Sequence, residues 1–164
     1  MGEEMSKVRR AIKKEKRRSL SETISELSRK PSYSQVGAIG IFIGVVRGVT
    51  TEGENVVGLE LEAYEEKTDE VLEGICQDLK SKKGIADVQI YHLLGKFTVG
   101  EELVHVIVAG SHREEVFETL KLAVERYKKE APIFKKEIII DRETGGQREY
   151  WTREKEGADR PIQS

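Results

Sequence analysis

Two long segments of the chain carry apolar residues at helical spacing. They span residues 65–82 and 111–131, and in each the apolar side chains recur at every fourth position. These positions are Val71, Ile75 and Leu79 in the first segment and Val116, Leu120 and Val124 in the second. Because this spacing places each set on one helix face, we predict two amphipathic helices that pack against a common core.

The other segments have the composition of β-strands. They are rich in β-branched residues or alternate between apolar and polar positions. The predicted strands are residues 36–47, 56–64, 86–97, 103–109, 134–141 and 148–152. In one of them, alternation places Val57, Leu59, Leu61 and Ala63 on the same buried face. The pattern predicts an α+β or α/β domain with two main helices against a mostly antiparallel or mixed sheet.

The N-terminal region is basic and weakly patterned. Residues 1–30 hold ten Lys and Arg against five Asp and Glu, whereas the rest of the chain holds 18 against 25. Ser19 and Glu22 have the spacing of a capping box, which predicts a short helix over residues 20–29. The basic residues before this helix could contact nucleic acid or an acidic partner.

The composition fits a single domain. We expect residues 19–154 to form it, preceded by a basic extension, residues 1–18, that is helical or disordered, and followed by a polar tail, residues 155–164. There is no apolar run of membrane-spanning length and no signal-peptide pattern, so a cytoplasmic protein without membrane contact is expected. Cys76 lies on the apolar face of the helix over residues 65–82, and we interpret it as a core residue rather than a nucleophile.

The start of the second long helix breaks a rule of helix electrostatics. Ser111 and Glu114 have capping-box spacing, which makes Ser111 the predicted N-cap. His112 and Arg113 then occupy the first two helical positions, where the positive end of the helix dipole disfavours cations. Either both side chains point into solvent, or they hold a phosphate or carboxylate at the free N–H groups.

The end of the same helix carries a second basic cluster. Pro132 ends the helix, with Lys128 in its last turn and Lys135 just beyond. The helix dipole by itself favours a lysine such as Lys128, but the two lysines on either side of the turn indicate the rim of one pocket. His112 and Lys128 are 16 residues apart, which is about 24 Å along a helix. The helix therefore serves two sites, or two chains of a symmetric dimer complete one.

The chain lacks motifs for metals and nucleotides. His92 and His105 lie in predicted strands without a second ligand at metal-site spacing. Neither G-x-G-x-x-G nor a P-loop is present. We therefore expect no metal and no cofactor.

Several short motifs occur in the order and spacing of a known family. They are Phe42-x-Gly44-x-Val46-Arg47, Leu59-x-Leu61-Glu62-Ala63-Tyr64, His92-x-x-Gly95 with Gly100-Glu101, Ser111-His112-Arg113, and Lys128-x-x-Ala131-Pro132-Ile133-Phe134-Lys135-Lys136-Glu137. From about Leu20 to Trp151 the chain resembles the large, catalytic subunit of molybdopterin synthase. The resemblance implies a single-domain α+β fold of the α/β hammerhead kind, with a small β subdomain.

The resemblance also implies an activity and partners. In that family a small ubiquitin-like subunit carries a C-terminal thiocarboxylate and donates its sulfur to cyclic pyranopterin monophosphate. Two transfers form the dithiolene of molybdopterin, in the biosynthesis of the molybdenum cofactor. The implied assembly is a homodimer of large subunits with a small subunit at each outer end, hence a heterotetramer.

Residues that match the family's motifs receive roles by this resemblance. Lys128 and Lys135 are the expected catalytic residues, Lys128 as general acid or base and Lys135 as the group that holds the thiocarboxylate or an acyl intermediate. The expected substrate-binding residues are Val45, Val46, Arg47, His112, Arg113, Lys128, Lys135, Lys136 and Glu137, with Arg153 or Lys155 from the C-terminal segment. Of these, His112 and Arg113 are expected to reach across from the other subunit.

The alternative interpretation is a non-catalytic module that binds a phosphate ligand or nucleic acid through the basic extension and the lysine-rich segments. Sites for single-stranded RNA usually contain aromatic side chains on which bases stack. Aromatic residues make up only 6% of this chain, and most lie at positions expected in the core. The composition therefore disfavours nucleic acid as a partner.

Overall fold

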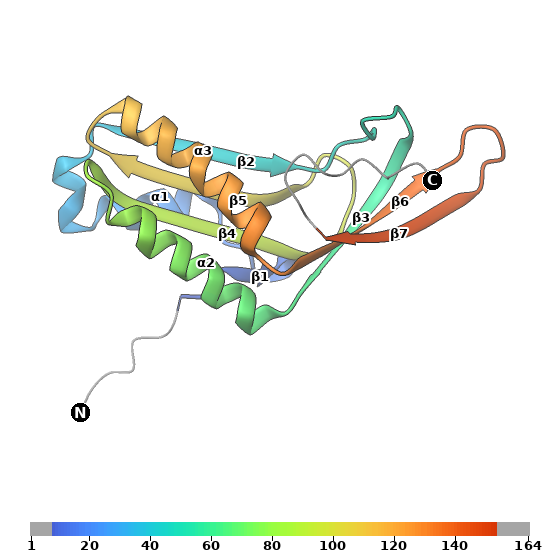
Figure 1. Cartoon of the computed structure of the whole chain (residues 1–164), viewed down its shortest axis with the longest axis horizontal. Coiled ribbons are helices and arrows are strands. Elements are labelled where there is room, and N and C mark those ends of the chain that lie inside the picture. Colours follow the sequence, from blue (N-terminus) through green and yellow to red (C-terminus); the bar gives the residue numbers. More distant parts are fainter. Residues whose placement is uncertain (1–7, 154–164) are drawn as a thin grey trace.

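Helices α2 and α3 cover one face of a seven-stranded sheet (Figure 1). The computed structural model describes residues 8–153. In chain order the elements are β1 (Ala11–Lys13), η1 (Lys14–Lys16), α1 (Leu20–Ser28), η2 (Pro31–Gln35), β2 (Ala38–Val45), β3 (Asn55–Ala63), α2 (Glu65–Lys80), β4 (Ile85–Phe97), β5 (Glu102–Gly110), α3 (Arg113–Glu130), β6 (Ile133–Ile140) and β7 (Gln147–Arg153). The order in the sheet is β2-β5-β4-β3-β6-β7, with β1 beside β4. All pairs are antiparallel except β1 with β4, so the predicted α+β class is confirmed.

Strand β4 joins two parts of the sheet. Residues 85–92 of this strand pair with β5, and residues 95–97 pair with β3. Strands β3, β6 and β7 therefore continue past the ends of the two main helices as a separate arm (Figure 1). This arm corresponds to the expected small β subdomain.

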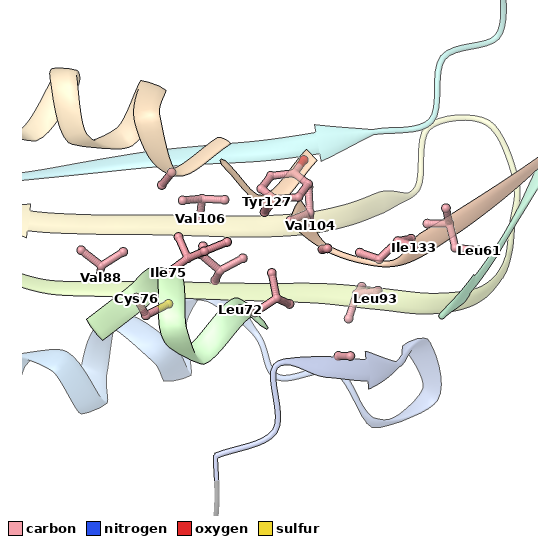
Figure 2. Packing of buried hydrophobic residues seen from close by; sticks show 14 of the residues in the cluster. Leu61, Leu72, Ile75, Cys76, Val88, Leu93, Val104, Val106, Tyr127 and Ile133 are labelled. Atoms are coloured by element: carbon pink, nitrogen blue, oxygen red, sulfur yellow. The ribbon is translucent and has the colours of Figure 1, made fainter. Parts of the chain in front are cut away.

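The main core lies between the sheet and helices α2 and α3 (Figure 2). The buried positions of α2 follow the predicted stripe and include Leu72, Ile75 and Leu79, and α3 contributes Val116 and Tyr127. Burying these side chains removes a large apolar area from water, which is the main source of stability for the two helices.

None of the helices in the described residues is long and apolar enough to cross a membrane.

The interpretation of Cys76 as a core residue is confirmed. Its side chain is buried on α2 in the main core (Figure 2). Burial raises the pKa of the thiol to about 11. The thiol is therefore protonated near neutral pH and is a poor nucleophile.

Helix α1 packs on the opposite face of the sheet. Its Leu27 contacts Ile107 and Ala109 of β5 in a second, smaller core. The helix begins as predicted, because the Ser19 hydroxyl accepts a hydrogen bond from the Glu22 N–H and the Glu22 carboxylate accepts one from the Ser19 N–H.

Within the N-terminal extension, predicted to be helical or disordered, residues 11–13 instead form a strand, and residues 14–16 form a 3-10 helix. Strand β1 pairs in parallel with residues 92–94 of β4, and Arg10 and Ala11 are buried. Asp69 on α2 fixes the strand, since its Oδ1 accepts hydrogen bonds from the N–H groups of Arg10 and Ala11 at 2.8 and 2.7 Å. The guanidinium of Arg10 in turn contacts Glu73 at 2.5 Å. Residues 1–7 and the predicted tail, residues 155–164, lie outside the described residues.

Two local predictions also differ from the structure. Helix α3 begins at Arg113 with His112 as its N-cap and without a side-chain cap, so the predicted Ser111 capping box is wrong. The Ser111 N–H instead donates to the Gly84 carbonyl at 2.8 Å, which holds Ser111 against the turn between α2 and β4. Val57 is exposed rather than buried, because an irregularity between Val56 and Gly58 interrupts the alternation of β3.

Candidate active site

A cavity of about 460 Å³ lies where the main sheet meets the arm. Its walls come from the end of β2 and the loop after it, from β3 and the start of β5, and from the last turn of α3 with β6 and β7. The predicted residues that line it are Val45, Val46, Arg47, Lys128, Lys135 and Glu137. Six of the nine expected binding residues are thus gathered from three separate segments of the chain.

The end of β2 holds Arg47 at the mouth of this cavity. The backbone of buried Val46 forms two hydrogen bonds with the turn before β5, from its N–H to the Glu101 carbonyl at 3.0 Å and from the Gly100 N–H to its carbonyl at 2.9 Å. Val45 and Arg47 on either side remain exposed. The exposed residues Val45 and Arg47 therefore flank a backbone that the turn holds in place in the cavity wall.

A glycine allows β2 and β5 to approach each other closely in the cavity wall. A Cβ at Gly44 would lie 2.6 Å from Cγ1 of Val104. The β2–β5 register also shifts between Gly44 and Val45. This glycine of the Phe42-x-Gly44 motif is therefore explained by packing.

Lys128 reaches the cavity from the last turn of α3. Its neighbour Tyr127 is fully buried and meets the His92 ring edge-on, with 5.6 Å between ring centroids. This packing fixes the rotation of α3 and directs the half-buried Lys128 toward the cavity. Among the residues that the structure describes, no carboxylate forms an ion pair with Lys128.

Lys135 is held by an acidic neighbour on its own strand. Alternation along β6 places Lys135 and Glu137 on one face, where Nζ lies 3.3 Å from Glu137 Oε1. Both side chains are largely buried, with exposed fractions of 16% and 19%. The hydroxyl of Tyr150, opposite Glu137 on β7, donates to Glu137 Oε2 at 3.0 Å. Burial, together with the charge of Glu137, raises the pKa of Tyr150 to about 12, so the phenol remains a donor near neutral pH.

Three of the expected residues lie away from the cavity. His112 and Arg113 are exposed at the start of α3, about 24 Å along the helix from Lys128. Lys136 faces the other side of β6, where Nζ lies 2.9 Å from Glu60 Oε2 and stands over the Trp151 ring. The structure therefore brings together Lys128 of α3 and Lys135 of β6, but not the basic residues at the start of α3.

The C-terminal candidates can be placed only in part. Arg153 ends β7, with its Cα opposite Phe134. Lys155 lies outside the described residues.

Sequence reasoning missed two tyrosines of the cavity wall. Tyr127 follows the apolar spacing of α3, which predicts a core residue, and Tyr150 becomes part of the site through the pairing of β6 with β7. This place depends on the register of the β6–β7 hairpin, in which Tyr150 lies opposite Glu137. The adjacency of Tyr127 to Lys128 was the one available indication.

The histidines in the strands have structural partners. His92 is buried, with Nδ1 3.0 Å from the Leu93 carbonyl, and Nε2 of His105 lies 2.7 Å from Glu102 Oε2. Within residues 8–153, no group of three or more His, Cys, Asp or Glu side chains is arranged to hold a metal ion.

Comparison with known proteins assigns the family. The family model described as MoaE protein matches residues 14–130, from η1 to the end of α3. The chain belongs to the MoaE protein family. The matched range includes Arg47 and Lys128 and ends before Lys135.

Relatives and solved structures of this family resemble the chain over most of its length. It is 38% identical over 115 residues to the molybdopterin synthase catalytic subunit of Bacillus subtilis, which covers 70% of this chain and 73% of that protein. It is 34% identical over 124 residues to a probable molybdopterin synthase of Haloferax volcanii, but this match covers 74% of the chain and only 48% of that protein. The crystal structure of molybdopterin synthase from Staphylococcus aureus superimposes with a TM-score of 0.69 at 26% identity, over 87% of this chain and 96% of that one.

Proposed function

We propose that this chain is the catalytic subunit of a molybdopterin synthase. In this role it transfers sulfur from the C-terminal thiocarboxylate of a small ubiquitin-like carrier to cyclic pyranopterin monophosphate. The observation that carries the proposal is the cavity, which gathers Arg47, Lys128 and Lys135 in a member of the MoaE family. The related proteins named above are themselves molybdopterin synthases or their catalytic subunits.

The charges of the cavity suit two anionic reactants. The pterin substrate carries a cyclic phosphate and the carrier carries a thiocarboxylate. These two anions repel each other unless nearby cations neutralise their charge. Arg47 at the mouth offers a planar guanidinium for the phosphate, which such groups bind through two hydrogen bonds. Val45 and Val46 line the same wall.

The two lysines have separate proposed roles. Lys135, held by Glu137, binds the carrier's thiocarboxylate and stabilises the oxyanion that forms when its carbonyl carbon is attacked. Lys128, which has no carboxylate partner in the described residues, donates or accepts the proton during transfer. In each transfer the sulfur forms a bond to a side-chain carbon of the pterin, a carbon–oxygen bond at that carbon breaks, and the displaced oxygen leaves with a proton. The carbon–sulfur bond of the carrier also breaks, and the oxygen of a water molecule replaces the sulfur to leave a carboxylate.

His112 and Arg113 can reach such a cavity only from a second subunit. We propose a homodimer in which His112 and Arg113 of one copy bind the pterin phosphate in the cavity of the other, with one carrier per large subunit in a heterotetramer. The exposed position of both side chains at the start of α3 leaves them available for this contact. No role in the cavity is proposed for Lys136, and the reaction is proposed to occur in the cytoplasm.

Reconstitution tests the proposal. The purified chain is mixed with a thiocarboxylated carrier and cyclic pyranopterin monophosphate, and molybdopterin is measured. The proposal requires product that depends on the chain and falls at least tenfold in Arg47→Ala and Lys135→Ala, because each change removes a charge that contacts an anionic reactant. Absence of product despite a bound carrier would refute the proposed reaction. Absence of carrier binding as well would favour the phosphate-ligand module.

A further inference from the structure

Glu137 links a tyrosine on β7 to a lysine on β6. Each of its carboxylate oxygens has one of these partners, since Oε2 accepts from the Tyr150 hydroxyl at 3.0 Å and Oε1 lies 3.3 Å from Nζ of Lys135. All three residues line the cavity. The three side chains therefore form a continuous chain of contacts from β7 to the ammonium group.

Of the three side chains, the tyrosine has the fewest rotatable bonds. Its Cα lies opposite that of Glu137 in the β6–β7 register, and an aromatic side chain has only two rotatable bonds before its hydroxyl. Glutamate and lysine side chains have more rotamers and lose more entropy when fixed. A hydrogen bond from the phenol restricts Glu137, and Glu137 in turn restricts the lysine. The phenol is protonated at neutral pH, as any tyrosine with a pKa of about 10 or above is.

We propose that Tyr150 is a positioning residue, which fixes the Lys135 ammonium in the cavity through the carboxylate of Glu137. This inference rests on the proposed function, in which Lys135 binds the carrier's thiocarboxylate. Tyr150 itself need not touch a reactant. Its loss should therefore slow sulfur transfer without weakening the binding of the pterin.

A pair of tyrosine variants isolates this role. Tyr150→Phe removes only the hydroxyl, while Tyr91→Phe removes a hydroxyl that donates to Gln89 at 2.9 Å, away from the cavity. We expect Tyr150→Phe to reduce the single-turnover rate of sulfur transfer about tenfold, with KM for the pterin changed less than about twofold. Tyr91→Phe should stay within about twofold of the wild type in both parameters. A rate in Tyr150→Phe equal to that of Tyr91→Phe would overturn the proposal.

A double variant shows whether the effect passes through the lysine. Because Tyr150 acts only by placing Lys135, adding Tyr150→Phe to Lys135→Ala should cause no further loss of rate. If the two losses multiply, Tyr150 acts by another route and the proposal fails.

Glu137→Gln tests the same link at the residue that joins Tyr150 to Lys135. It should resemble Tyr150→Phe in rate and KM, and a rate equal to wild type would count against the link.

Crystal structures of the free chain separate this inference from the proposed function. In Tyr150→Phe we expect Glu137 to adopt another rotamer and the contact between its carboxylate and Nζ of Lys135 to be lost. If that contact keeps its length of 3.3 Å, the positioning role is refuted, whether or not the wild type is active. If the wild type transfers no sulfur, the proposed function fails, and the crystal structures still decide whether Tyr150 places Lys135.

Discussion

Asp69 is predicted to be the main anchor of the N-terminal strand. Its Oδ1 accepts hydrogen bonds from two backbone N–H groups, those of Arg10 and Ala11, and both residues are buried. Its Oδ2 pairs with Arg9 at 2.9 Å, on an arginine whose side chain is more than half exposed. Asp69→Ala therefore leaves two donors unpaired and removes one weak surface ion pair.

The structure sets the size of this effect. An unpaired buried donor costs about 1–3 kcal/mol, and an exposed ion pair contributes less than about 1 kcal/mol. Two donors would cost about 2–6 kcal/mol, but β1 can detach and let water hydrate them, which limits the loss. We expect a decrease in the free energy of unfolding of about 2–4 kcal/mol, measured by urea denaturation. Trypsin should also cleave residues 8–18 faster than in the wild type.

A neighbouring residue provides the control. Glu70 lies on the same helix, is mostly exposed, and contacts only Lys67, at 3.8 Å, among the ion pairs of the described residues. Glu70→Ala should change the free energy of unfolding by less than about 0.5 kcal/mol. Equal stability and equal cleavage rates for Asp69→Ala and Glu70→Ala would refute the anchoring role of Asp69.

Two further predictions concern a pair of glycines and the buried cysteine. Gly110→Ala should destabilise the fold by about 2–4 kcal/mol, because its Cβ would lie 2.5 Å from the Gly84 carbonyl oxygen. Gly74→Ala, on α2 with open space around the added Cβ, should instead stabilise it by about 0.5–1 kcal/mol; the opposite order of the two Tm shifts would contradict this packing. Burial raises the pKa of Cys76 from 9.0 to about 11, so the unfolded chain loses the thiol proton first and stability should fall between pH 9 and 11 by about 2–3 kcal/mol. Cys76→Ala should lack this part of the decrease in urea denaturation at these pH values, and a pH dependence identical to the wild type would exclude the effect.

Local patterns in the sequence predict most of the elements. The apolar stripes of α2 and α3 place Ile75 and Val116 in the core, and the capping box at Ser19 places the start of α1. These features depend on residues within one helical turn of each other. The ends of the predicted elements agree with the structure to within about two residues, as expected for such patterns.

The features that the sequence patterns do not predict depend on contacts between distant parts of the chain. Strand β1 has only three residues, and the partner that makes burial of Arg10 tolerable, Glu73, lies 63 positions away. At Ser111 the backbone contact with Gly84 takes precedence over the local capping pattern. A sequence pattern contains neither of these pairings.

The candidate site shows the same division. The turn between α3 and β6 predicts that Lys128 and Lys135 lie close together, and both line one cavity in the structure. Strand alternation could have separated Lys136 from Lys135, because consecutive residues of a strand face opposite sides. Tyr150 could not be assigned, since its place opposite Glu137 depends on the β6–β7 register.

The most direct test of the central claim compares two adjacent lysines of α3. Lys128 lines the cavity, whereas Lys129 is exposed and lies outside it. Sulfur transfer is followed by mass spectrometry, as conversion of the carrier's C-terminal thiocarboxylate to a carboxylate in the presence of the pterin. We predict that Lys128→Ala abolishes pterin-dependent conversion while unfolding at the same temperature as the wild type, and that Lys129→Ala retains full activity. An active Lys128→Ala variant, or equal loss in both variants, would contradict the assignment of the cavity as the active site.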